Sequence, residues 1–315
     1  MNRPVHMPGK LGRFWRRYRA AYLFAGPYLV GLVVLLLVPL AASLALSFVR
    51  WDGVGGLDRA QWVGTTHYAR MLSGDDPFFT KALTNTLIYA GAAVPLGLCA
   101  SLGLAMLLNR KLAGIGIFRT IFYLPHVVAG VATIMMWQWV FNPDLGPVNA
   151  ALRAAGVDTD SGDLFLWLHS PTGCKPALIL MSLWGLGGSM LIFLAALQNV
   201  PEHLHEAARV DGAGRWRRFW HITLPAISPA MLFNLVMGLI AAMQIFTKAF
   251  LLWSHQQRNG LLMMVPQIYY EAFKFGHFGY ASAMAWILLV IILALTTLVL
   301  GTSRRWVYYE AGGAA

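Results

Sequence analysis

The sequence from Pro201 to Pro225 is PEHLHEAARVDGAGRWRRFWHITLP. This polar stretch lies between two apolar runs, at about 176–198 and 226–252. A bilayer-spanning helix needs roughly 20 mainly apolar residues, and each run is long enough. The stretch is therefore expected to connect two transmembrane helices on one side of a membrane.

The connector has the pattern of a short helix followed by a turn. Pro201 suits a helix start, where its missing N–H would be unpaired anyway, and the helix dipole favours the carboxylate of Glu202 in the first turn. Gly212 and Gly214 break the helix and permit a left-handed turn. We therefore expect a helix over residues 202–210. The basic and aromatic residues that follow are expected to contact anionic membrane lipid: Arg215, Trp216, Arg217, Arg218, Phe219 and Trp220.

The composition of the whole chain is that of a membrane protein. Of its 315 residues 58% are hydrophobic and only 12% are charged, with a mean hydropathy of +0.59, which excludes the soluble and disordered classes. The apolar runs lack the alternation of β-barrel strands, so helices must satisfy the backbone in lipid. The predicted fold class is an all-α polytopic membrane protein with six transmembrane helices, at about 21–49, 82–108, 117–141, 176–198, 226–252 and 281–302.

The formal net charge of +11 is divided unevenly between the two sides of the predicted membrane. If the N-terminus lies inside, the inner segments hold 15 of the 24 Lys and Arg residues but only 4 of the 13 acidic residues. The outer segments hold 8 basic and 9 acidic residues. This positive-inside pattern predicts that both termini and the loop at 199–225 are cytoplasmic. It also accounts for the basic charge without nucleic acid as a partner.

Two segments outside the loop need interpretation. The run at 21–49 follows a basic tail, but it is longer than the 7–15-residue core typical of a secretory signal and more spans follow, so we expect an uncleaved helix. The outer connector at 142–175 contains Leu164–Leu168, which is too short to cross a bilayer. We expect this segment at the membrane surface or facing outward, anchored by Trp167.

The stretch at 201–225 resembles the EAA loop of importer-type ABC transporter permeases, where the membrane subunit docks on its ATPase. The likeness lies in Glu206-Ala207-Ala208, then Gly212, then Ile222 and Leu224-Pro225 at the end. The resemblance implies a set of ATPase-coupling residues: Glu206, Ala207, Ala208, Arg209, Asp211, Gly212, Leu224 and Pro225.

The likeness extends through most of the chain. It includes ALTNTL at 82–87, FRTIFYLP at 118–125, WQWVFNP at 137–143 and FGYASA at 278–283. These segments resemble the carbohydrate branch, of the maltose and glycerol-3-phosphate type, and the first permease of the usual pair. The resemblance implies the type I ABC importer permease fold. Along the chain we expect a cytoplasmic basic tail, first transmembrane helix and outer loop at 1–81, a transmembrane domain of five helices with the coupling loop (199–225) at 82–303, and a cytoplasmic tail at 304–315.

The resemblance also implies partners: a second homologous permease, two ABC ATPase subunits and an extracytoplasmic solute-binding protein in a bacterial-type cell membrane. This sequence lacks G-x-x-x-x-G-K-[ST], the loop that cradles nucleotide phosphates. We therefore expect no enzyme activity and no cofactor, with ATP hydrolysis by a separate subunit. The implied function is import of a sugar; a polyol, glycerol phosphate or other small polar solute is the alternative.

A sugar pathway needs stacking surfaces and neutral hydrogen-bonding groups. Polar groups inside spans are candidates because they are costly when they face lipid, and the maltose-type resemblance places Gln244 and Gly185 in stretches that line the sugar cavity. Helix–helix packing is the alternative role. The candidates for the substrate pathway are Gln244, Gly185, Trp184, Gln138 and Asn234.

Lys248 is the one charged residue deep in a predicted span. An isolated ammonium there costs roughly 2.5–3.5 kcal/mol on insertion scales. The position near the outer end favours snorkelling of the side chain toward the bilayer surface. Contact with an anionic substrate, such as a sugar phosphate, is the alternative.

A membrane-embedded enzyme is the interpretation from a different class. His203 and His205 are two positions apart, so they point to different helix faces, unlike the i, i+4 pair of zinc-binding helices. Asp75-Asp76 stands in an outer loop without a second acidic motif. We therefore predict no catalytic residue and no metal site.

Overall fold

A computed structural model describes residues 23–53, 56, 60–110, 112–128, 130–159, 162–253 and 260–308. Four helices in this part are long and apolar enough to cross a membrane: Leu23–Leu46, Pro77–Leu108, Ser228–Leu252 and Phe278–Ser303. Two bent pairs bring the number of spans to six if each pair is one span: Ile115–Val127 with Gly130–Val140, and Cys174–Trp184 with Gly187–Gln198. The predicted all-α, polytopic fold is confirmed. The predicted basic N-terminal tail and the end of the C-terminal tail lie outside the described residues.

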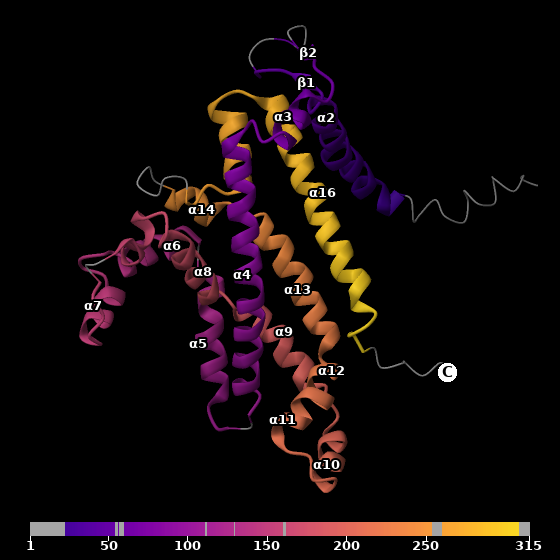
Figure 1. Ribbon diagram of the computed structural model, residues 1–315. Helices are drawn as coiled ribbons and strands as arrows, with labels where there is room; N and C mark the ends of the chain where they lie inside the picture. The colour runs from indigo at the N-terminus through magenta and orange to yellow at the C-terminus, as the bar shows by residue number, and fades with distance from the viewer. Residues whose placement is uncertain are drawn as a thin grey trace, which may run out of the picture.

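Figure 1 shows the arrangement of these helices. The first elements are η1 (Val33–Leu37), α2 (Val38–Leu46), β1 (Val49–Arg50), β2 (Gln61–Trp62), α3 (Thr66–Leu72), α4 (Pro77–Leu108), α5 (Ile115–Val127), α6 (Gly130–Val140), α7 (Pro147–Ala154), η3 (Asp163–His169), α8 (Cys174–Trp184) and α9 (Gly187–Gln198). They continue with α10 (Glu202–Val210), α11 (Arg215–Arg218), η4 (Phe219–Thr223), α12 (Leu224–Ala226), α13 (Ser228–Met243), α14 (Thr247–Leu252), α15 (Met264–Tyr269), η6 (Tyr270–Lys274) and α16 (Phe278–Ser303).

The long helix α4 is the centre of the bundle and packs against α8, α9 and α13. On the far side of α13 lies α16, and α2 packs against α16 (Figure 1). The strands β1 and β2 mark one end of the molecule, the hairpin end, and α10 and α11 mark the other, the α10 end.

The bundle has two separate apolar cores. The larger cluster includes Met181, Met243 and Met284. The smaller one lies between α4 and α9 and includes Ala105 of α4 and Phe193 of α9, which are both fully buried. The small side chain of Ala105 leaves room for the close packing of these two helices.

The outward-facing surface of the spans is apolar. In the apolar 18-residue stretch of Leu23–Leu46 no residue is buried inside the protein. In that of Phe278–Ser303 only 22% of the residues are buried. Large apolar side chains such as Phe24, Leu35 and Leu298 are mostly exposed. A soluble monomer rarely exposes an apolar surface of this extent, so this surface is suited to contact with lipid.

Two spans that the sequence predicted as continuous, 117–141 and 176–198, are bent by more than 40°. The second break falls at Gly185 and Leu186, between α8 and α9. Glycine favours such a break because it is a weak helix former. Gly187 then starts α9 against α5, where an added Cβ would lie 2.9 Å from the Cα of Tyr123. The break therefore serves close helix packing as well.

The segment Leu164–Leu168 was predicted to lie at the membrane surface or to face outward, with Trp167 as its anchor; its position relative to the membrane stays a prediction, but the structure shows what Trp167 contacts. The segment forms η3, and the Trp167 side chain is only 8% exposed. Its indole N–H donates a hydrogen bond to Asn149 Oδ1 over 2.6 Å, and its ring lies 5.0 Å from that of Phe141. Trp167 therefore anchors this segment to the protein, because Asn149 supplies the partner that its buried N–H needs.

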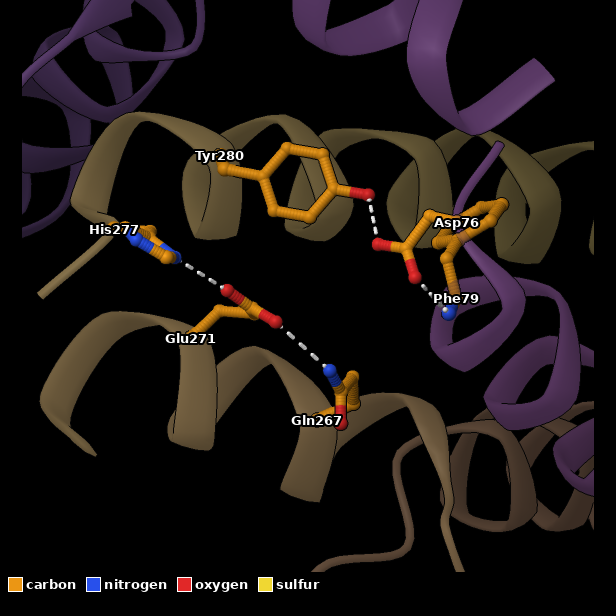
Figure 2. Close-up of polar contacts among 6 residues, drawn as sticks. All are labelled: Asp76, Phe79, Gln267, Glu271, His277 and Tyr280. Atoms are coloured by element: carbon orange, nitrogen blue, oxygen red, sulfur yellow. Dashed lines mark hydrogen bonds and ion pairs between the residues drawn. The ribbon is translucent and has the colours of Figure 1, made fainter. Parts of the chain in front are cut away.

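Two groups of polar contacts join α4, α16 and the α15–η6 segment at the hairpin end (Figure 2). Asp76 is the N-cap of α4, and its Oδ1 accepts hydrogen bonds from the backbone N–H groups of Phe78 and Phe79. Its Oδ2 accepts a hydrogen bond from the hydroxyl of Tyr280 on α16. Nearby, Glu271 accepts hydrogen bonds from Gln267 over 3.0 Å and pairs with His277 over 2.8 Å. These contacts hold the first turns of α4 and α16 and the α15–η6 segment in place.

Candidate functional site

The loop at the α10 end has the predicted short helix, with bounds Glu202–Val210. The helix ends in a left-handed turn at Gly212, whose φ is 76°. The N–H of Ala213 donates to Ala208 O over 2.8 Å, and the N–H of Gly212 donates to Arg209 O over 3.1 Å. This pair of bonds is the Schellman motif, in which a glycine satisfies the last carbonyl groups of a helix.

One face of α10 is open. Glu206, Ala207, Arg209, Asp211 and Gly212 are all exposed, and Ala208 is half-buried. A Cβ added to Gly212 would meet nothing within 4 Å. The apolar side chain of Val210 is 88% exposed. The surface therefore combines small residues, charges and an exposed valine, a mixture suited to contact with another protein.

The loop is anchored to the bundle at its second end. Leu224 and Phe219 pack against the apolar cluster that contains Phe193 and Ile227. The hydroxyl of Ser228 donates a hydrogen bond to Pro225 O over 2.6 Å and accepts one from the backbone N–H of Tyr308 over 2.8 Å. Leu224 and Pro225 thus connect the loop to α13 and to the segment that follows α16.

The basic and aromatic residues between Gly214 and Leu224 form α11 and η4. Trp216 is 77% exposed and Trp220 is 58% exposed, and both contact Phe219 edge-to-face. Arg218 also acts on α10: burial lowers the pKa of His205, and the nearby charges of Arg218 and Arg209 lower it further.

A cavity of about 390 Å³ lies between α4, the α8–α9 break, α13 and α14. Because it lies beside α4, the central helix of the bundle, we call it the central cavity. This volume lies within the range of about 300–1,000 Å³ that is usual for ligand pockets. Its polar lining residues are Tyr89, Ser182, Ser189, Asn234, Thr247 and Lys248.

The cavity lies where two spans depart from regular helix. Leu186 stands in the α8–α9 break, and Ile245 and Phe246 stand between α13 and α14; all three residues line the cavity. Irregular backbone at membrane depth is tolerated only where it is buried in protein or lines a water-filled cavity. The breaks and the cavity are therefore one feature.

The five residues predicted for the substrate pathway lie in different places. Asn234 is buried, lines the cavity, and has an Nδ2 without a hydrogen-bond partner among the described residues. Gly185 ends α8 and accepts a hydrogen bond from His126, while Trp184 is 48% exposed and contacts Trp137 edge-to-face. Gln138 and Gln244 are exposed on α6 and at the end of α13. Only Asn234 of the five lines this cavity, and the role of all five stays a prediction.

The Lys248 side chain points to α8. Its Nζ lies 3.5 Å from Met181 O, and the residue lines the cavity. Met181 stands one turn before the break in α8, toward the middle of the bent pair. The amine therefore contacts the neighbouring helix α8, while snorkelling of this side chain toward the bilayer surface stays a prediction. The sequence could have revealed this cavity wall only through its scattered polar residues, Ser182 and Ser189 among them.

Two sequence patterns, His203 with His205 and Asp75 with Asp76, were considered as signs of an enzyme. In the described part of the chain no group of three or more His, Cys, Asp or Glu residues could hold a metal ion. Asp76 caps α4, as described above. His203 is exposed on α10, and His205 is half-buried.

Together, the spans, the central cavity and the open loop define a membrane-spanning transport protein. The sequence profile of the family described as "Binding-protein-dependent transport system inner membrane component" matches residues 79–309. The chain belongs to this family of ABC transporter permeases, and it is an inner membrane component with membrane-spanning helices.

Several relatives are similar over almost their whole length. The probable ABC transporter permease protein YesP of Bacillus subtilis (strain 168) is 40% identical over 93% of each chain. The lactose transport system permease protein LacF of Rhizobium radiobacter is 32% identical, over 90% of this chain and 94% of LacF. A chain of the bacterial alginate ABC transporter in complex with alginate pentasaccharide-bound periplasmic protein has the same fold, with a TM-score of 0.81, 24% identity, and coverage of 94% of this chain and 98% of that one.

Proposed function

We propose that this chain is the permease subunit of an ATP-driven importer and passes a sugar, delivered by an extracytoplasmic binding protein, through the central cavity into the cytoplasm. The name of the relative LacF, a lactose permease, supports a sugar as the substrate. The neutral hydrogen-bonding groups of Ser182, Ser189 and Asn234 in the cavity wall suit sugar hydroxyls.

The observation that carries this proposal is the position of α10 between two helices of the cavity wall. Only three residues, Asn199–Pro201, separate α9 from α10, and η4 and α12 lead directly from the loop into α13. Both α9 and α13 line the cavity. A partner protein that binds α10 and shifts it would therefore also move α9 and α13, which form part of the cavity wall.

This connection supports a mechanism of alternating access. In the proposal, Glu206 to Gly212 lie in a groove of an ABC ATPase, and the α10 end faces the cytoplasm. Closure of two ATPases around ATP would shift this permease and a second homologous one from an inward-open to an outward-open state. Such a switch requires a bistable interface, biased by nucleotide on one side and by the loaded binding protein on the other.

Reconstitution tests the proposal. The chain is purified from membranes in mild detergent with the proteins that accompany it, and the assembly is placed in proteoliposomes with its co-encoded binding protein. We expect a second permease and an ATPase to co-purify, and sugar uptake to require ATP. Uptake that proceeds without ATP, or recovery of the chain alone after cross-linking, would overturn the proposal in favour of a secondary transporter.

A further inference from the structure

Lys248 is a cation placed in the wall of the central cavity. It stands in the first turn of α14, directly after the turn that separates α13 from α14. Its neighbours Phe246 and Thr247 line the same cavity. The charge is therefore held at a point where the backbone departs from regular helix and opens onto a space of about 390 Å³.

No acidic residue compensates this charge in the described part of the chain. Among the described residues that line the cavity, Lys248 is the one that carries a charge, and none is Asp or Glu. Its described hydrogen bond is to Met181 O, at the long distance of 3.5 Å. An ammonium group has three N–H donors, so at least two remain for a group inside the cavity.

A purely structural role would be to cap α8. A cation near a helix C-terminus interacts favourably with the helix dipole, and Met181 lies in the last turn of α8. That role would use one donor and would affect every substrate alike. It would give no reason for the absence of a carboxylate from the described cavity wall.

We propose that Lys248 pairs with an anionic group, a carboxylate or a phosphate, on a sugar that passes through the cavity, so that the permease favours acidic sugars. This inference rests on the proposed sugar-import function and specifies its substrate class. The hydroxyl groups of the sugar would form hydrogen bonds with Asn234, Ser182 and Ser189. A charge in a low-dielectric wall discriminates strongly between an acidic sugar and its neutral counterpart.

The test uses the complete transporter in proteoliposomes with its binding protein. ATP-dependent uptake is measured for glucuronate and galacturonate disaccharides, for hexose 6-phosphates, and for the neutral sugar that corresponds to each. The variants are Lys248→Gln and Lys248→Arg. Lys81→Gln is the matched control, because Lys81 is exposed on α4 and does not line the cavity.

We expect the wild type to prefer an acidic sugar over its neutral counterpart. Loss of a charge-assisted hydrogen bond should reduce this preference about tenfold or more in Lys248→Gln, while Lys248→Arg keeps the preference and Lys81→Gln behaves as the wild type. The uronate and hexose phosphate arms decide between carboxylate and phosphate.

Two results would overturn the inference while the proposed function stands. One is ATP-dependent uptake of neutral sugars in preference to acidic ones by the wild type. The other is an equal loss of acidic and neutral uptake in Lys248→Gln, which the removal of a cap on α8 would produce. A wild type that moves no sugar with ATP would instead contradict the proposed function, and the inference with it.

Discussion

Tyr280, in the first turn of α16, donates a hydrogen bond over 2.5 Å to Asp76, the N-cap residue of α4 (Figure 2). The two residues are 204 positions apart in the sequence, and both are buried. One carboxylate thus caps the central helix of the bundle and joins it to the last span.

Replacement of Tyr280 by Phe should weaken this junction. A hydrogen bond to a charged group contributes about 1.5–3 kcal/mol, so Tyr280→Phe should lower the thermal stability of the protein in detergent. Tyr28→Phe is the control, because Tyr28 is 72% exposed on the first span. Equal melting temperatures for the two variants would show that the bond adds no stability.

Substitution of Gly279 should disturb the contact between α16 and the hairpin. A Cβ on this residue would overlap the carbonyl oxygen of Val49, and overpacking of this kind typically costs about 1–3 kcal/mol. Gly279→Ala should therefore destabilise the protein in thermal unfolding. Gly301→Ala, on the same helix, should not, because its added Cβ meets nothing within 4 Å. The prediction fails if both variants unfold at the wild-type temperature.

Gly212→Ala should disturb the end of α10. An L-residue in the left-handed conformation costs roughly 1–2 kcal/mol, and the φ of Gly212 is 76°. Gly214 has a φ of −65°, so Gly214→Ala is a matched control two residues away. ATP-dependent uptake should fall in Gly212→Ala and persist in Gly214→Ala. Equal uptake by the two variants would separate the turn from transport.

Glu206→Lys tests the proposed docking of α10. Glu206 is exposed and makes no ion pair with another described residue, so reversal of its charge should leave membrane insertion intact. We expect loss of ATPase co-purification and of uptake. Asp144→Lys is the control, a charge reversal on an exposed residue outside the α10 loop. Normal ATPase recovery and uptake with Glu206→Lys would contradict the docking proposal.

His205 should make the stability of α10 depend on pH. Burial, aided by Arg218 and Arg209, lowers its pKa in the folded state below the ordinary value of about 6.5. The unfolded state then binds the proton more readily, so stability is lost as the pH falls below about 6.5. The protection factors of the α10 amides, which correct hydrogen exchange for its intrinsic dependence on pH, should therefore fall as the pH is lowered from about 7.5 to about 5.5, and less so in His205→Gln than in the wild type.

A control for this pH effect lies on the same helix. His203 is exposed on α10. The His203→Gln variant should therefore keep the wild-type pH dependence of the protection of the α10 amides from hydrogen exchange. If His203→Gln and His205→Gln alter the exchange equally, the burial of His205 is not its cause.

Features that depend on neighbouring residues could be predicted from the amino-acid sequence alone. The length of each apolar run placed the spans, because the thickness of the bilayer requires a fixed number of residues. Local chemistry likewise predicted the helix at 202–210 and its end before Gly212, since a glycine satisfies the left-handed turn without a partner elsewhere in the chain.

Which residues share a cavity depends instead on how the helices pack. Gln244 follows the end of α13 and is exposed, whereas Asn234 and Lys248 line the space beside α4. The buried positions of Trp167 and of the Asp76–Tyr280 pair likewise depend on partners far away in the sequence. Hydropathy records whether a segment suits lipid, but the direction of each side chain is set by packing between helices, which a local pattern does not contain.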